Sequence, residues 1–89
     1  MSTDNDAIDT KVRAILSAIL GISEERARHF NNQTGLFGSL PELDSMAVAG
    51  LLAELEDQFG IVVDDDEVDG ELLETFGGLT NYVGRKLAA

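Results

Sequence analysis

The sequence contains no cysteine and no tryptophan, and it has a single proline among its 89 residues. Without cysteine the chain can form neither a disulfide bond nor a thiolate metal site. No apolar stretch approaches the ~18 residues that a membrane-spanning helix needs. The first ten residues, MSTDNDAIDT, have neither the basic start nor the apolar run of a signal peptide. From this length and composition we expect a single cytoplasmic domain spanning residues 1–89.

Basic residues are scarce, and they lie near the two ends of the chain. Six Lys and Arg stand against 17 Asp and Glu, which gives a formal net charge of −11. The segment from Phe30 to Gly84 contains no Lys, Arg or His but holds twelve carboxylates. Nucleic acids and anionic membrane surfaces are polyanions that would repel such a chain. The charge therefore argues against both as partners and favours proteins with basic surface patches.

The sequence also lacks the usual surroundings of a catalytic serine. It has no Gly-x-Ser-x-Gly motif, and its only histidine, His29, is expected to be an exposed loop residue. Nucleophilic catalysis needs a base beside the nucleophile and a group that orients that base. We therefore predict that the protein is not an enzyme.

The spacing of the apolar residues predicts an all-α fold. The predicted helices cover about residues 5–20, Ser45 to Phe59, a short stretch within residues 64–76, and a last helix that carries Leu79, Tyr82, Val83 and Leu87. Val68, Leu72 and Phe76 form the apolar stripe of the short third helix, which we expect Gly77 and Gly78 to end. Residues 61–63 are predicted to form an extended connection.

Residues 21–44 hold no long helical stripe, so we expect a long loop between the first two helices. A short helical turn is expected from Ser23 to Arg26. The apolar side chains that should fix this loop to the core are Leu36, Phe37, Leu40 and Leu43. The predicted architecture is a small four-helix bundle with a long loop between helices one and two and a short third helix.

The residues that open the second helix are the strongest candidates for a functional site. Asp44 is a good N-cap residue, and its carboxylate suits the positive end of the helix dipole. Ser45 follows it with no base nearby in the sequence, so its hydroxyl fits an attachment point better than a catalytic nucleophile. Gly50 is anomalous, because glycine inside a helix costs ~1 kcal/mol relative to alanine and this position lies off the apolar stripe. The close approach of a partner or of a tethered group would explain it.

These residues resemble a known family. The run from Leu36 to Met46, LFGSLPELDSM, resembles the prosthetic-group site of acyl carrier proteins, and the closing pattern from Glu74 to Val83, ETFGGLTNYV, fits the same family. The resemblance covers about residues 5–87 and implies a four-helix fold. It also implies that the Ser45 hydroxyl carries 4′-phosphopantetheine through a phosphodiester, with acyl groups held on its thiol as thioesters. A phosphodiester there would lie at a helix N-terminus, where free N–H groups favour an anion.

The resemblance further implies which residues meet partner enzymes. Met46 stands where the family usually has leucine, and the carboxylates of Glu54, Glu56 and Asp57 match acidic positions that contact basic patches. Gly50 replaces a position that is commonly acidic, so docking is expected to shift toward the second half of the helix. The expected partners are a phosphopantetheinyl transferase and an acyl-activating ligase, synthase or acyltransferase with a basic surface.

The acyl cargo is left open by the sequence. The Leu-Pro-Glu-Leu-Asp-Ser-Met site resembles specialised carriers that work with a dedicated ligase, and D-alanyl or other aminoacyl carrier proteins also show a Leu-Asp-Ser start. We expect a monomer whose core beside the second helix shelters part of the acyl chain. The candidate lining residues, chosen from their apolar positions, are Leu51, Leu55, Phe59, Val68 and Tyr82.

Two functions of a different class compete with this interpretation. The first is a calcium-binding loop, with Asp65, Glu67 and Asp69 at loop positions 1, 3 and 5 and Gly70 at the glycine position. The twelfth position is then Phe76, where a bidentate glutamate is required, so no specific metal site is predicted. The second is an acidic protein-interaction domain that never receives a prosthetic group.

Overall fold

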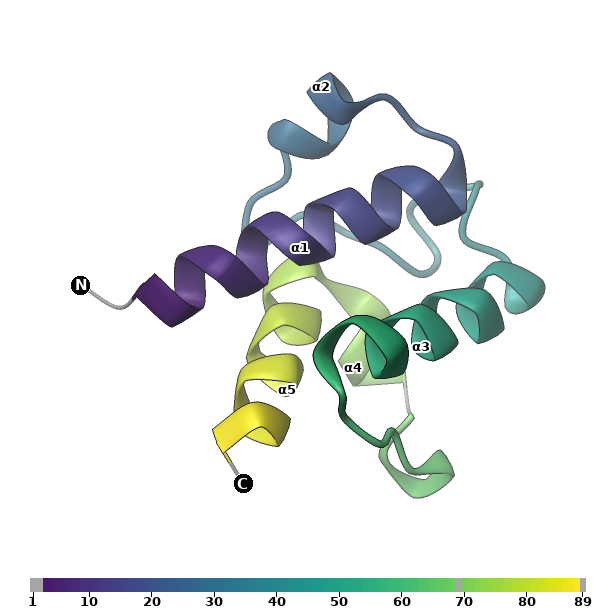
Figure 1. The fold of residues 1–89 in the computed structure, drawn as a ribbon. Coiled ribbons are helices and arrows are strands. Elements are labelled where there is room, and N and C mark those ends of the chain that lie inside the picture. Colours follow the sequence, from purple (N-terminus) through teal and green to yellow (C-terminus); the bar gives the residue numbers. More distant parts are fainter. Residues whose placement is uncertain (1–2, 69, 89) are drawn as a thin grey trace.

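The computed structural model describes residues 3–68 and 70–88, without the side chains of residues 3–6, 65 and 70. Within these ranges the chain forms helices joined by loops, and the only strand-like pairing is an isolated antiparallel bridge between Gly35 and Thr75 (Figure 1). The elements are α1 (Thr3–Leu20), α2 (Glu24–Arg28), α3 (Ser45–Phe59), the 3-10 helix η1 (Asp65–Glu67), α4 (Gly70–Glu74) and α5 (Phe76–Ala88). None of the described helices is long and apolar enough to cross a membrane.

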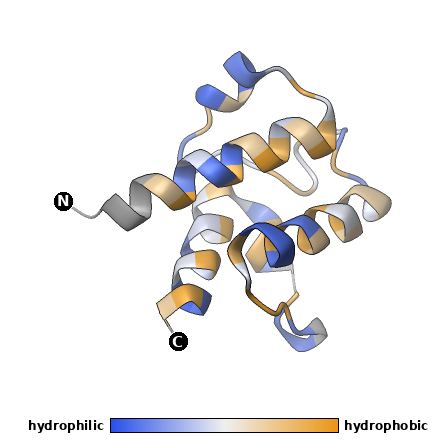
Figure 2. Ribbon diagram, in the orientation of Figure 1, coloured by the Kyte–Doolittle hydropathy of each residue, from blue (hydrophilic) through white to orange (hydrophobic). Residues whose placement is uncertain are grey.

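The long helix α1 organises the core. It packs against α2, α3 and α5, while α4 packs against α5. The apolar residues that α1 carries at helical spacing are largely buried, with Val12 and Leu16 wholly inaccessible to solvent. Figure 2 shows hydrophobic stretches along α1 and α3 and largely hydrophilic residues on α2. Helix α1 therefore provides the apolar surface against which α3 packs.

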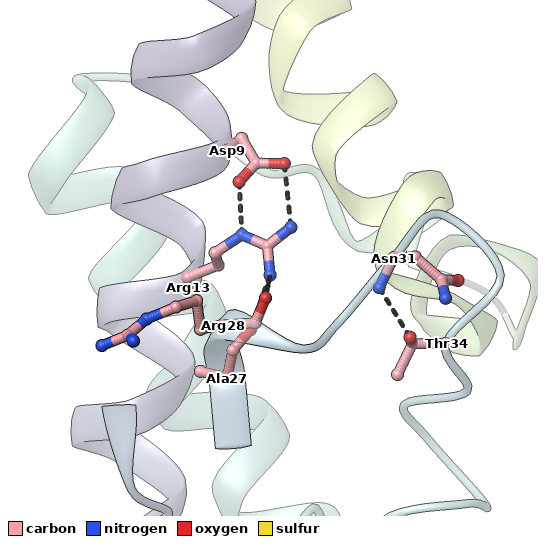
Figure 3. A network of polar contacts seen from close by, with 6 residues as sticks. All are labelled: Asp9, Arg13, Ala27, Arg28, Asn31 and Thr34. Atoms are coloured by element: carbon pink, nitrogen blue, oxygen red, sulfur yellow. Dashed lines mark hydrogen bonds and ion pairs between the residues drawn. The ribbon is translucent and has the colours of Figure 1, made fainter. Parts of the chain in front are cut away.

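Arg13 fixes α2 to α1. Its guanidinium pairs with Asp9 one turn earlier and donates to the carbonyl oxygens of Ala27 at 2.6 Å and Arg28 at 3.1 Å (Figure 3). It also lies 4.6 Å from the centroid of the buried Phe76 ring. The cation thus binds the last carbonyl groups of α2, of which that of Ala27 also accepts the Phe30 N–H at 3.1 Å. The helical turn predicted near residues 23–26 is confirmed as α2, which Ser23 caps.

The loop that follows α2 is held by the junction between α4 and α5. The N–H groups of Leu36 and Phe37 donate to the carbonyls of Glu74 at 2.8 Å and Leu73 at 2.9 Å. Leu36 is fully buried, as predicted. The expectation for Phe37 is wrong, because its side chain is 45% exposed although its backbone N–H is bound.

The short third helix predicted within residues 64–76 is present as α4, but the apolar stripe assigned to it is divided among several elements. In place of one stripe, Val68 follows η1, Leu72 lies in α4 and Phe76 opens α5. The same loop explains the division, because the Phe76 N–H donates to Thr34 O at 2.9 Å and the Glu74 carbonyl is taken by Leu36. The Phe76 N–H is therefore not available to continue a helix across Thr75.

Gly77 and Gly78 do not end a helix, and this prediction is also wrong. Both lie in the first turn of α5, where Gly77 is buried. A Cβ atom placed on Gly77 would come within 2.7 Å of the Asn32 carbonyl oxygen, which accepts the Gly77 N–H at 3.0 Å. Glycine is therefore present here because the loop passes directly over the start of α5.

Candidate attachment site at the start of α3

Ser45 is the first residue of α3, and it is exposed. The residue before it, Asp44, has an extended backbone (φ −96°, ψ −176°) and is the N-cap. Its carboxylate accepts the N–H of Ala47 at 2.8 Å, and its carbonyl accepts the N–H of Val48 at 2.9 Å. The helix runs to Phe59, as predicted, and ends where Gly60 takes the left-handed conformation (φ 67°). The position of Ser45 is thus set by local hydrogen bonds that the sequence itself specifies.

The chain leading into Ser45 is anchored from two sides. Leu43 is buried, and its N–H donates to Leu40 O at 3.0 Å. On the outer side, Glu42 pairs with Arg26 of α2 through N–O distances of 2.7 Å and 3.4 Å. The hydrogen bonds from Arg26 hold the pKa of Glu42 below its usual value. The segment that precedes the exposed Ser45 is therefore held in place on both sides.

The start of α3 suits a covalently attached anion. The first four N–H groups of a helix have no partner within it, and Asp44 satisfies only those of Ala47 and Val48. The amides of Ser45 and Met46 have no partner among the described residues, and α3 is long enough for its dipole to favour negative charge there. A phosphodiester on the Ser45 hydroxyl would meet this arrangement, so the residues present fit the group that the sequence suggested. No described side chain is hydrogen-bonded to the Ser45 hydroxyl as a base would be.

The predicted docking residues differ in how available they are. Met46 is 85% exposed, and Asp57 is exposed. Glu54 is half-buried and accepts a hydrogen bond from the Gln58 side chain at 3.0 Å. Glu56 turns inward, since its carboxylate accepts the N–H of Val63 at 2.8 Å. Of the predicted docking residues, Met46 and Asp57 are therefore the most accessible to a partner, and Glu54 is less so.

Gly50 faces α1 and is half-buried. A Cβ atom there would lie 3.9 Å from the Ile19 side chain, which is an ordinary van der Waals contact. The protein's own packing thus leaves room for alanine. We expect Gly50→Ala to stabilise the protein by ~0.5–1 kcal/mol, because alanine restricts the unfolded chain and favours the helix. Urea denaturation measures this, and a lower midpoint in the variant would contradict it.

The candidate lining residues of an acyl pocket belong to one apolar region. Leu51 and Leu55 are completely buried and Tyr82 is 4% exposed, while Phe59 and Val68 are partly buried against the same core. They come from α3, α5 and the segment between α3 and α4. An acyl chain could reach Leu51 or Leu55 only if this segment or its neighbours moved.

One set of interacting residues was missed by the sequence reasoning. A single carboxylate oxygen of Glu67, Oε1, accepts hydrogen bonds from the Tyr82 hydroxyl at 2.8 Å and from Lys86 Nζ at 3.0 Å. Tyr82 and Lys86 stand four residues apart on α5, which places them on one face of the helix. That spacing was the available signal, but the partner is 15 residues earlier, where the sequence suggested only position 3 of a calcium-binding loop.

The acidic segment of the calcium alternative shows no cation site among the residues that can be described. No group of three potential metal ligands is found there. Phe76, which would occupy the twelfth loop position, is fully buried in the core. Asp69 lies outside the described residues, as does the side chain of Asp65.

Comparisons with known proteins agree on one family. The family model described as "Phosphopantetheine attachment site" matches residues 10–83. The chain is 32% identical over 82 residues to the acyl carrier protein of Thermotoga maritima, which covers 92% of this chain and 94% of that protein. Its fold matches the solution NMR structure of a holo acyl carrier protein from Nitrosomonas europaea with a TM-score of 0.83 and 39% identity, covering 92% of this chain and 96% of the other.

Proposed function

Because this chain belongs to the acyl carrier proteins of the phosphopantetheine attachment family, we propose that Ser45 is the residue that carries its 4′-phosphopantetheine. The proposal is supported chiefly by the exposed Ser45 hydroxyl at a capped helix N-terminus, where the amides of Ser45 and Met46 have no partner among the described residues. When bound, the arm supplies a terminal thiol that holds an acyl group as a thioester, which this cysteine-free chain cannot do itself. Asp44 fixes the first turn, and the amides of Ser45 and Met46 would stabilise the phosphodiester charge.

Members of this family act as carriers, and we propose that this chain has no catalytic activity of its own. The Ser45 hydroxyl would be the acceptor in a reaction that a phosphopantetheinyl transferase catalyses. A ligase, synthase or acyltransferase would then charge the thiol. The exposed position of Ser45 supports this division of labour, because both the transferase and later enzymes must reach the same point.

We propose that these enzymes present basic surfaces to α3. Among the described residues, three of the six Lys and Arg side chains pair with carboxylates within the protein, namely Arg13, Arg26 and Lys86. Lys11 lies beside the end of α3, where it donates to the Gln58 carbonyl at 3.5 Å, but the carboxylates of α3 outnumber it. Met46 would supply an adaptable apolar contact beside the attachment point, and Asp57 and Glu54 would supply the charge.

The charge of Asp57 is expected to speed modification of the protein. In Asp57→Lys, transfer of the arm to Ser45 should slow by about three- to tenfold at low ionic strength, and added salt should abolish the difference. Initial rates with a purified transferase measure this. Glu25→Lys on α2 is the matched control, since it makes the same charge change at another exposed position. Equal slowing in both variants would show that only net charge matters and would refute docking at Asp57.

Further expectations extend this function. We propose that the core beside α3, lined by Leu51, Leu55, Phe59, Val68 and Tyr82, shelters part of an acyl chain. The cargo is an acyl group, and an aminoacyl group such as D-alanyl is the alternative that the site sequence suggests. We also propose that residues 1–89 form one carrier domain that acts as a monomer in the cytoplasm.

The decisive experiment is co-expression with a promiscuous phosphopantetheinyl transferase. Intact-mass measurement should show the gain of one phosphopantetheine, and fragmentation of the peptide should place it on Ser45. A protein of unchanged mass after exposure to an active transferase would overturn the proposal and leave an acidic interaction domain. The transferase must modify a known carrier protein in the same experiment, so that its own activity is established.

A further inference from the structure

The segment between α3 and α4 is hydrogen-bonded to α3 itself and to α5. We call residues 61–68 the strap. Near its start, Ile61 is buried and the Val63 N–H donates to Glu56 of α3 at 2.8 Å. Near its end, Glu67 binds α5 through Tyr82 and Lys86. Figure 1 shows the strap leaving the end of α3 and passing through η1 before the chain turns back to α4. The strap therefore bridges α3 and α5.

Glu67 is the centre of the second fastening. Its Oε1 atom accepts from the Tyr82 hydroxyl at 2.8 Å, from Lys86 Nζ at 3.0 Å and from the N–H of Asp64 at 3.3 Å. Lys86 also lies 4.0 Å from the Asp64 carboxylate and 5.9 Å from the centroid of the Tyr82 ring. One carboxylate oxygen of Glu67 is thus hydrogen-bonded both to the N–H of Asp64, which precedes η1, and to two side chains of α5.

The ionisation of these groups supports a closed arrangement at neutral pH. Hydrogen bonds from Lys86 and then Tyr82 lower the pKa of Glu67, so its carboxylate is charged. Burial, followed by the hydrogen bond to Glu67, raises the pKa of Tyr82 to about 12, so the phenol keeps the proton that it donates. Each donor therefore has the charged acceptor that makes such hydrogen bonds strong.

The strap closes the part of the bundle where α3 is least supported. Helix α3 packs chiefly against α1 and only lightly against α5. The residues proposed to line an acyl pocket lie on both sides of the contact between α3 and α5, with Leu55 on α3, Tyr82 on α5 and Val68 on the strap itself. Leu55 has no exposed surface. An apolar chain can therefore reach it only after the helices or the strap separate.

We propose that Glu67 is a latch that holds the strap on α5, and that an apolar acyl chain enters between α3 and α5 only when this latch opens. The proposal rests on the carrier function proposed above. A ligand that binds only an open state has its apparent affinity reduced by the fraction of protein that is closed. The latch would thus select cargo by apolar length, because each buried methylene favours the open, filled state. Long chains would enter, and short acyl groups would remain outside.

The first test measures the latch in the protein without cargo. Glu67→Gln replaces the charged acceptor with a neutral one, and Tyr82→Phe removes the donor while keeping the buried ring. Amide hydrogen exchange in the strap should accelerate by about threefold or more in both variants, because opening costs less. Asp66→Asn, an exposed strap residue with the same change of charge, is the control and should exchange as the wild type does. Unchanged exchange in both latch variants would overturn the proposal.

The single tyrosine gives an independent reading of the contact. Tyr82 is the only tyrosine and there is no tryptophan, so phenolate absorbance reports this side chain alone. The pKa is about 12 in the wild type, and Glu67→Gln should lower it part of the way toward 10.0, since burial remains. Asp66→Asn should leave it unchanged. An unaltered titration in Glu67→Gln would show that the two side chains do not meet in solution.

The second test uses protein charged on its arm with octanoyl or acetyl groups. If the latch limits entry, the octanoyl thioester should be cleaved more slowly by hydroxylamine in Glu67→Gln and Tyr82→Phe than in the wild type, by about threefold. The acetyl thioester should be cleaved equally in all of them, because it is too short to be buried. Octanoyl cleavage that is unchanged or faster in the latch variants would mean that the closed strap forms a wall of the pocket and does not gate it.

The two proposals fail in different ways. If Ser45 never receives the arm, no acyl form can be made and the carrier assignment fails, while hydrogen exchange still shows whether the strap is latched. If the arm is attached normally but the octanoyl thioester does not respond to the latch variants, only the gating proposal fails.

Discussion

Ser45→Ala is expected to abolish attachment of phosphopantetheine completely. The reaction needs a hydroxyl oxygen that can attack the phosphoryl donor, and alanine has none. The fold should survive, because Ser45 is exposed and its side chain makes no hydrogen bond within the described residues. The cap on α3 also remains, since it comes from the Asp44 carboxylate. Intact mass after co-expression with a transferase should therefore equal that of the bare polypeptide.

Ser39→Ala is the matched control for this prediction. Ser39 is also exposed, and it lies in the loop six residues before Ser45, outside any helix. The Ser39→Ala variant should still be modified at Ser45 to the same extent as the wild type. An adduct that survives in Ser45→Ala, or one that disappears in Ser39→Ala, would move the attachment point to another residue. Circular dichroism of both variants should match the wild type, which excludes unfolding as the cause of the loss.

The features that the sequence predicted well are those encoded by neighbouring residues. Helix α3 has its cap at Asp44, an apolar stripe at helical spacing and Gly60 at its end, and all of these act within one or two turns. The candidate site shares this property, because the exposure of Ser45 and the free amides follow from its place at the start of a capped helix. Local signals were thus sufficient to predict the helix and the position of Ser45 at its start.

The features that were predicted wrongly depend on residues far apart in the chain. The division at Thr75 arises because the Thr34 carbonyl accepts the Phe76 N–H that would continue a helix. The exposure of Phe37 has the same origin, because the loop passes over the junction of α4 and α5. The Phe37 N–H is bound there, and its ring is left exposed. Periodicity cannot report such contacts, since it compares only residues within a few turns.

The same limit explains why Glu67 was missed. Within the sequence it is one of several carboxylates in a run, and nothing local separates it from Asp66. The difference is tertiary, because α5 brings Lys86 within 3.0 Å of Glu67 across 19 residues of chain. The negative charge of this segment was therefore evident from the sequence, but the contact between Glu67 and Lys86 was not.

Gly77→Ala should destabilise the protein by about 1–3 kcal/mol, which is a large part of the stability of a domain this small. The added methyl group would lie 2.7 Å from the Asn32 carbonyl oxygen and 2.9 Å from its Cβ atom. The nearest of these atoms belongs to the backbone, so relief requires the loop to move and would lengthen the bond between the Gly77 N–H and Asn32 O. Urea denaturation should show a lower midpoint.

Gly50→Ala is the control that shows whether the effect at Gly77 comes from the loop that passes over α5. Both substitutions add one methyl group inside a helix, and helix propensity alone would favour alanine by ~1 kcal/mol at each position. Only at Gly77 does the methyl group meet a backbone, whereas at Gly50 the nearest atom is a side-chain carbon at 3.9 Å. The two variants should therefore change stability in opposite directions. If Gly77→Ala were as stable as the wild type, the loop at Asn32 would not lie over the start of α5. The loop that leads to Ser45 would then have to be anchored by other contacts.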